Sequence, residues 1–382
     1  MTTTMCSSDP SPFTFLSLPI HLQERILSLL PVSYLLPLLS VSRAFPSLLR
    51  SPTFPSPPPD LFFLLFSPAS PPFSSLISFH PSSRRWISLP LSSHSPLSLS
   101  RPSATSSSLA ICIFPPTGAD NGGPSTVSSP LVALRMFSRL PPQEIPPMIP
   151  VGDPYVLAVI PDADVALPRS SDHFKIVAAS SWKYGVFSQV YDSRLGNWVP
   201  AGEIQSQFVV LGNTALINRS LYVHAYLPDQ LLQFDLISHT WKFIIPMPEN
   251  MMSSHIFSYD QILYLVSGFE DVGVMTSIRV LMLNRGENRE SLEWREISIL
   301  SETEEVFEGF TGSCCWLFHF AAVDRDGLVC LHNSLTNKVL LFDVRDMSWV
   351  LVPPCGPVPK DVKWYGYATE MGLEVLMPGV AG

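Results

Sequence analysis

The sequence predicts a mainly β protein with a short α-helical block near its N-terminus. Three observations predict this fold class. Residues 18–54 are rich in leucine at helical spacing, and residues from 61 onward form short apolar runs broken by turn residues. In addition, one short pattern recurs at intervals of about 50 residues. We therefore expect a helical module followed by a large domain of repeated β units.

The composition excludes several classes of function. The 382 residues carry a net charge of −9, and the 14% that are charged form no basic tract. Proteins that bind nucleic acid concentrate lysine and arginine, so we expect no nucleic acid partner. No apolar run reaches the roughly 18 residues of a membrane-spanning helix, so we expect no membrane contact.

The cysteines and the first residues predict a cytoplasmic or nuclear location. The six cysteines include no CxxC pair, which argues against a zinc site and fits a reduced compartment. The N-terminus lacks the basic and apolar regions of a secretory signal. Its serine and threonine content leaves a transit peptide as the alternative.

The helical block has one clear apolar face. Leu22, Ile26, Leu29 and Leu30 recur at helical spacing, and Leu18-Pro19 is suited to open the helix while Pro31 ends it. A second apolar run follows at 35–41. The alternative is a leucine-rich helical hairpin of no special kind.

The order and spacing of these residues resemble an F-box. The matching positions are Leu18-Pro19, Leu22, Ile26-Leu27, Leu30-Pro31, Leu35-Leu36, Leu38 and Val41-Ser42-Arg43-Ala44-Phe45. Pro37 and Pro46 depart from the family pattern. The resemblance implies docking on a Skp-type adaptor through Leu18, Pro19, Leu22, Ile26, Leu27, Leu30, Pro31, Leu38 and Val41. We expect a disordered tail at 1–16, the F-box at 17–55, a proline-rich linker at 56–60 and the β domain at 61–382.

The repeated pattern is an aromatic residue and an aspartate, with a tryptophan six residues after the aspartate. Its copies are Tyr191-Asp192 with Trp198, Phe234-Asp235 with Trp241, and Phe342-Asp343 with Trp349. Phe79-His80 with Trp86 and Leu283-Asn284 with Trp294 are variants. We expect a strand ending at the aspartate, a tight turn, and an outer strand opened by a largely buried tryptophan.

This repeat resembles the degenerate kelch-type propellers that follow the F-box in plant F-box proteins, although the Gly-Gly doublet of kelch repeats is missing. The fold expected is thus an N-terminal F-box and a roughly six-bladed kelch-like β-propeller. The expected blades are 174–200, 215–245, 256–299, 319–353, one within 90–170 with strands at 111–114 and 131–137, and 61–89 completed by 364–377. Residues 117–129 are expected to form a mobile loop.

No pattern in the sequence predicts catalysis, a metal site or a cofactor. Cys330 and His332 share a strand face and are expected in the core, and Asp324 to Gly327 is interpreted as a hairpin turn. The acidic run 302–308 is interpreted as a solvated loop, with contact to a basic partner as the alternative. We therefore expect a protein that is not an enzyme.

The loops between the second and third strands of the blades are the predicted target-binding surface, because they emerge at one end of the ring. They are expected at 180–187, 227–230, 268–276 and 333–337. The candidate residues are Trp182, Tyr184, Asp229, Phe269, Glu270 and Asp271. The alternative for Trp182 and Phe269 is that their rings pack onto the rim of the domain.

The two resemblances together imply the substrate-recognition subunit of an SCF-type (Skp–cullin–F-box) E3 ubiquitin ligase. The F-box would dock on the Skp-type adaptor, and through it on a cullin, while the propeller recruits a target protein. The alternative is a small-molecule-sensing or enzymatic propeller with a merely structural helical N-terminus. A polar pocket with perturbed titrating groups would favour that alternative.

Overall fold

The computed structural model describes residues 14–30, 32–49, 51, 53–55, 61–66, 76–80, 85–89, 104–106, 111–114, 131–135, 143–146, 153–161, 173–182, 185–205, 209–226, 228–271, 274–286, 291–301, 323–325, 327–332, 339–352 and 363–366. These residues fall into two compact units, a helical unit at 14–55 and a β unit at 61–366. The predicted linker at 56–60, the loop at 117–129 and the acidic run 302–308 lie outside them.

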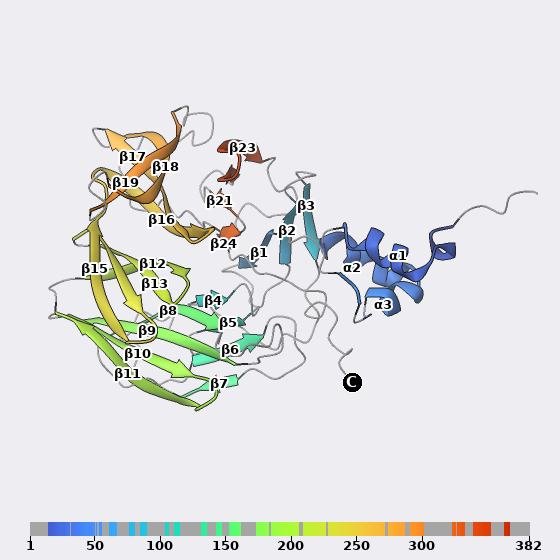
Figure 1. Ribbon diagram of the computed structural model, residues 1–382, viewed down its shortest axis with the longest axis horizontal. Coiled ribbons are helices and arrows are strands. Elements are labelled where there is room, and N and C mark those ends of the chain that lie inside the picture. Colours follow the sequence, from blue (N-terminus) through green and yellow to red (C-terminus); the bar gives the residue numbers. More distant parts are fainter. Residues whose placement is uncertain are drawn as a thin grey trace, which may run out of the picture. The chain divides into compact units, whose positions relative to one another are not determined.

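The helical unit contains a short 3-10 helix and three α-helices (Figure 1). They are η1 (Phe15–Ser17), α1 (Ile20–Leu27), α2 (Val32–Val41) and α3 (Ala44–Leu49). The Pro19 carbonyl accepts the first backbone hydrogen bonds of α1, and α1 ends at Leu27, before the predicted end at Pro31. The second apolar run, 35–41, lies within α2, which runs through Pro37.

Four leucines form the core of the helical unit. Leu27, Leu35, Leu48 and Leu49 are buried together, with Phe15, Leu30, Leu38, Phe45 and Phe54 packed against them. The rings of Phe15 and Phe45 stack with their centroids 5.9 Å apart. This core fastens α1 through Leu27 and leaves the other apolar positions of that helix outside it.

The described strands of the β unit form six four-stranded antiparallel sheets. In spatial order, the first contains β24 (Lys363–Gly366), β1 (Leu61–Phe66), β2 (Leu76–His80) and β3 (Arg85–Leu89). The second contains β4 (Ala104–Ser106), β5 (Ile111–Phe114), β6 (Leu131–Arg135) and β7 (Gln143–Ile145). The third contains β8 (Asp153–Pro161), β9 (Phe174–Trp182), β10 (Gly185–Asp192) and β11 (Asn197–Ile204).

The remaining three sheets follow the same order along the chain. The fourth contains β12 (Val210–Ile217), β13 (Ser220–Tyr226), β14 (Gln230–Asp235) and β15 (Thr240–Pro246). The fifth contains β16 (Met251–Tyr259), β17 (Ile262–Asp271), β18 (Val274–Arg285) and β19 (Leu292–Leu300). The sixth contains β20 (Val323–Arg325), β21 (Leu328–His332), β22 (Val339–Asp343) and β23 (Ser348–Val352).

The first strands of consecutive sheets contact one another, from β4 to β8, β12, β16 and β20. Trp86 of the first sheet packs against the buried cluster of the sixth. The first sheet also joins the two ends of the unit, because β24 pairs with β1 (Figure 1). This arrangement fits a propeller-like fold in which the last strand closes the first sheet.

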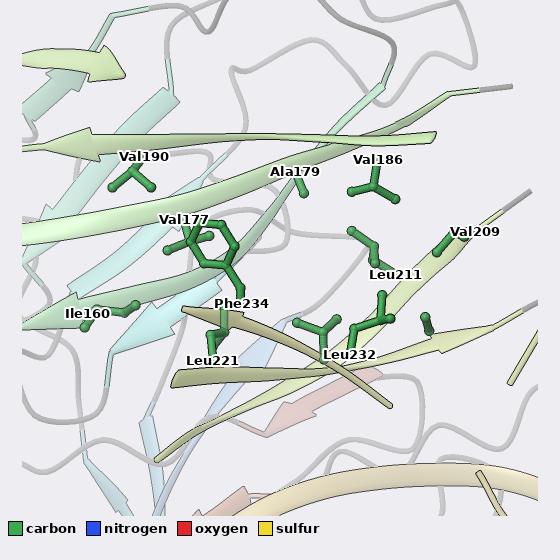
Figure 2. Close-up of a cluster of buried hydrophobic side chains, with 12 residues drawn as sticks. Ile160, Val177, Ala179, Val186, Val190, Val209, Leu211, Leu221, Leu232 and Phe234 are labelled. Carbon is green, nitrogen blue, oxygen red and sulfur yellow. The ribbon is translucent and has the colours of Figure 1, made fainter. Parts of the chain in front are cut away.

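Buried apolar side chains fill the space between neighbouring sheets. Figure 2 shows the cluster between the third and fourth sheets, where Val177 and Val190 face Leu221 and Phe234. A similar cluster joins the fifth and sixth sheets. Since one sheet cannot bury both of its faces alone, each depends on its neighbours for its core.

The repeated aspartate holds the turn after the third strand, as predicted. In three sheets its Oδ1 accepts a backbone N–H two residues ahead, at 2.8–2.9 Å; the pairs are Asp192–Arg194, Asp235–Ile237 and Asp343–Arg345. Four residues after each aspartate the backbone is left-handed, at Gly196, His239 and Met347. The repeat is therefore a repeated turn geometry as well as a repeated sequence.

The tryptophans open the fourth strands, as predicted, but they are half-buried rather than largely buried. The reason is that each indole N–H reaches back to the preceding sheet. The donor and acceptor pairs are Trp198 to the Pro146 carbonyl, Trp241 to Ser188 Oγ, Trp294 to the Pro246 carbonyl and Trp349 to Ser298 Oγ, at 2.6–3.3 Å. Each tryptophan thus links two neighbouring sheets at their edge.

Two predicted features of the blades need correction. The predicted blade 174–200 omits the first strand of its sheet. That strand is β8, which lies in the stretch 90–170, where the sequence predicts a separate blade. The predicted loops 180–187 and 268–276 are mostly strand, since β9 extends to Trp182 and β17 to Asp271. Ser180, Ser267 and Gly268 are buried in these strands, where small residues allow close packing although their types are typical of turns.

Candidate functional site

One face of α1 is apolar and exposed. Leu22 and Ile26, one helical turn apart in α1, are 41% and 44% exposed, and Leu29, in the turn that follows the helix, is 70% exposed; Ile20 and Val41 are also exposed. Isolated exposed apolar residues are common, but a contiguous row of them on one helix face typically marks an interaction site. We call the residues Leu22, Ile26 and Leu29 the α1 face.

The opposite side of α1 is polar and buried. Gln23 Nε2 donates hydrogen bonds to the carbonyls of Leu18, at 2.6 Å, and Leu16, at 3.3 Å. Both carboxylate oxygens of Glu24 lie 3.1 Å from Thr53 Oγ1, which donates to them. These hydrogen bonds satisfy the buried polar groups, so α1 is fixed with its apolar face outward.

The predicted adaptor-binding residues differ in their exposure. Pro19, Leu22, Ile26 and Val41 are exposed, whereas Leu18, Leu30 and Leu38 are half-buried. Leu27 is 3% exposed in the core of the helical unit, so it supports the α1 face and cannot itself be part of a contact surface. Pro31 lies outside the described residues.

Leu29 is the most exposed residue of the α1 face and is missing from the predicted set. The sequence does indicate Leu29, because Ile26 and Leu29 lie four and seven positions after Leu22, and residues at this spacing share one helix face. Ile20, which is 64% exposed directly after Pro19, has no such signal.

Phe269 does not belong to an exposed target-binding loop. It lies in β17, paired with Met251 and Ser277, and its side chain is 8% exposed in the cluster between the fourth and fifth sheets. The guanidinium of Arg279 covers its ring, with Cζ 4.7 Å from the ring centroid. The Phe269 ring is therefore buried between two sheets, whereas the alternative placed it on the rim of the domain.

The other predicted target-binding residues lie at the ends of paired strands. Glu270 is half-buried and Asp271 is exposed at the end of β17, and Asp229 is exposed in the turn between β13 and β14. Trp182 is the last residue of β9, opposite Gly185. The Trp182 side chain and the whole of Tyr184 lie outside the described residues.

Asp229 takes part in a cluster that the sequence pattern does not predict. His224 of β13 is 1% exposed; its Nε2 lies 3.3 Å from Asp229 Oδ1, and its Nδ1 lies 2.7 Å from Ser254 Oγ of β16. The Tyr226 ring packs against the imidazole, with centroids 4.1 Å apart. We call His224, Asp229, Ser254 and Tyr226 the His224 cluster.

The electrostatics of the His224 cluster follow from its burial. Burial lowers the pKa of His224 below its ordinary value, and the hydrogen bond and charge of Asp229 oppose this shift only in part. Burial also raises the pKa of Tyr226. Neutral imidazole and neutral phenol are therefore the stable forms at pH 7.

Other candidates in the described residues are structural. Cys330 is fully buried between the sixth and first sheets, as predicted for a core residue, and burial raises the pKa of its thiol. Within the described ranges, no group of three His, Cys, Asp or Glu side chains is arranged to hold a metal ion. No described helix is long and apolar enough to cross a membrane.

Comparison with known proteins gives one relative in sequence and several likenesses in structure. No family model matches the chain. The chain is 27% identical over 388 aligned residues to an F-box/kelch-repeat protein of Arabidopsis thaliana, covering 95% of this chain and 89% of that protein.

Solved structures align with lower similarity. They include a protein from Lactobacillus plantarum, with 11% identity and a TM-score of 0.46 over 78% of this chain and 82% of that one. Putative 6-phosphogluconolactonases from Bacteroides uniformis and Bacteroides fragilis give 10% identity and TM-scores of 0.47 and 0.42. Each covers 80% of this chain, which aligns with 100% and 98% of the respective structures. Likenesses at this level do not bear on activity.

Proposed function

Because the similarity along the chain supports the plant F-box/kelch-repeat family predicted from its sequence, we propose that this protein is the substrate-recruiting subunit of an SCF-type E3 ubiquitin ligase. The helical unit acts as the F-box and docks on a Skp-type adaptor, which connects it to a cullin. The β unit acts as a six-bladed kelch-type propeller that holds a target protein for ubiquitination.

The observation that carries this proposal is the α1 face. A surface helix normally turns its apolar side inward. In α1, Gln23 and Glu24 point inward with their hydrogen bonds satisfied, while Leu22 and Ile26 are exposed, as is Leu29 in the turn that follows the helix. This orientation is favourable when a partner protein covers the apolar side, as an adaptor would.

The size of the effect can be estimated from buried area. Burying one leucine-sized side chain contributes roughly 1.5–3 kcal/mol. Since each 1.4 kcal/mol changes affinity about tenfold, truncating two such side chains should weaken docking by about 100-fold or more. A loss of this size would abolish capture of the adaptor in a pull-down.

The target-binding surface is proposed at the end of the β unit where the second and third strands are joined. Asp229, Asp271, Glu270 and Trp182 are its candidate residues, and Phe269 is excluded because its ring is buried. The role proposed for the chain is recruitment, with ubiquitin transfer carried out by other subunits in the cytoplasm or nucleus.

The test uses two matched pairs of substitutions in α1 of the full chain. Leu22→Ala with Ile26→Ala removes two residues of the α1 face, whereas His21→Ala with Arg25→Ala changes two exposed polar positions at the same spacing. We expect the first pair to lose the Skp-type adaptor in a pull-down and the second to retain it. Equal capture by both pairs would leave the helical unit with a merely structural role.

A further inference from the structure

The His224 cluster joins the fourth and fifth sheets through a continuous chain of polar contacts. Ser254 comes from β16, His224 and Tyr226 from β13, and Asp229 from the turn that follows β13. The contacts from Ser254 Oγ to His224 Nδ1 and from His224 Nε2 to Asp229 Oδ1 measure 2.7 Å and 3.3 Å. A hydroxyl, an imidazole and a carboxylate therefore stand in series.

The chemistry of the three groups fixes where the protons lie. An ionised carboxylate can only accept hydrogen bonds, so His224 Nε2 carries the hydrogen and donates it to Asp229. In the neutral imidazole Nδ1 is then the acceptor, and the Ser254 hydroxyl donates to it; the Tyr226 side chain is a second hydrogen-bond partner of Ser254. A serine that donates to a neutral imidazole oriented by a carboxylate has the arrangement of an activated nucleophile.

The strand that carries Ser254 is irregular at this residue. The pairing of β16 with β17 shifts its register between Met251 and Ser254, and Ser254 is half-buried rather than fully buried. Such irregularities in strands often re-aim a side chain beside a functional site. Gly212 leaves space for the Tyr226 ring, because a Cβ at that position would lie 2.5 Å from Tyr226 Cε2.

We propose that Ser254 is a nucleophile that accepts the acyl group of a small carboxylic ester, with His224 as its base and Asp229 as the residue that orients His224. This would make the β unit a covalent ligand-binding site, an activity separate from adaptor docking. The proposal concerns one acyl transfer to the chain and needs no cofactor.

The transfer is balanced by groups of the cluster. Ser254 Oγ forms a bond to the ester carbonyl carbon while its proton passes to His224 Nδ1. The bond from that carbon to the alkoxy oxygen then breaks, and His224 returns the proton to the leaving alcohol. The Asp229 carboxylate stabilises the imidazolium that exists between these two steps.

The test is labelling of the full chain with a fluorophosphonate probe, followed by peptide mass mapping. The probe phosphonylates a nucleophilic serine with loss of fluoride. We expect one label per chain, on Ser254. Ser258 is an internal control on the same strand. Its hydroxyl donates to the Leu216 carbonyl at 2.9 Å, and a backbone carbonyl cannot act as a base, so Ser258 should not be labelled. Wild-type mapping alone decides the outcome even if a variant fails to fold.

Variants measure the part played by each group. His224→Gln should slow the labelling of Ser254 by about 100-fold, the usual range for loss of a general base, and Asp229→Asn should slow it less. Ser258→Ala should label like wild type. The proposal is overturned if Ser254 stays unlabelled in wild type, or if His224→Gln labels at the wild-type rate, which would make the cluster a structural link between two sheets.

Discussion

The exposed face of α1 and the core of the β unit place their apolar side chains in opposite ways. On α1 the polar Gln23 and Glu24 are buried, while Leu22 and Ile26 are exposed. In the β unit, side chains such as Phe234 are fully buried between sheets. The two regions therefore use the same class of residue for different purposes.

Because of this difference, stability and partner binding should respond to different substitutions in this chain. Apolar groups of the β unit already have partners within it, so their removal should lower the free energy of unfolding. Leu22 and Ile26 of α1 are exposed, so their removal should lower affinity for a docked protein and leave the fold intact. Substitutions in both units test this separation.

The largest expected effect is on stability, from Phe234→Ala. This ring is completely buried in the cluster between the third and fourth sheets, so its loss should reduce the free energy of unfolding by about 3–5 kcal/mol. Urea unfolding of the full chain measures it. Phe243→Ala is the matched control, because that ring is exposed on β15 of the same sheet. Similar losses for both would contradict the difference in burial between the two rings.

An intermediate effect is expected from Trp241, which links two sheets at their edge. Trp241→Ala should cost about 2–3 kcal/mol, below the range for a fully buried ring, because the indole is half-buried. Trp241→Phe should cost about 1 kcal/mol, the net value of the hydrogen bond to Ser188 Oγ.

A double-mutant cycle with Ser188→Ala isolates the hydrogen bond between the two sheets. Once Ser188 is replaced, Trp241→Phe should cost less than in the wild-type background. Fully additive losses in urea unfolding would mean that the indole stabilises the sheets by packing alone.

The smallest effect on stability is expected for the α1 face. Leu22→Ala with Ile26→Ala should change the free energy of unfolding by no more than about 0.5 kcal/mol per site, as for other surface positions. Leu27→Ala, next in the chain but buried, should cost about 2–5 kcal/mol. Thermal unfolding followed by circular dichroism compares them. If the exposed pair proves as costly as Leu27→Ala, the α1 face is part of the core.

Much of the β unit can be predicted because its turns repeat. The aspartate and tryptophan of each copy perform the same two contacts, so their spacing is visible in the sequence. The strand β8 has no such marker, and the buried Ser180 and Ser267 resemble turn residues, so strand lengths are harder to predict. These serines are buried because neighbouring strands pair across them, which only the fold reveals.

The candidate sites divide in the same way. The α1 face can be predicted from local helical spacing, with two exceptions. Leu27 is in the predicted set but is buried, and Leu29 is missing from that set but is exposed. The His224 cluster joins residues 30 positions apart on different sheets, so no local spacing indicates it. Phe269 follows Gly268, a residue type that favours loops, whereas pairing with β16 and β18 keeps it in a strand.

The pairing of β1 with β24 has a consequence for biosynthesis. Leu61 and Lys363 are about 300 residues apart, and ribosomes add roughly 5–20 residues per second, so β1 waits on the order of 15–60 s for this partner. During that interval the edge later covered by β24 belongs to the segment Leu-Phe-Phe-Leu-Leu-Phe, which has no charge and no proline. Such a segment with an open edge is prone to intermolecular strand pairing. The nascent chain is therefore expected to need a chaperone until its last strand emerges, and chains truncated before Lys363 should accumulate as aggregates.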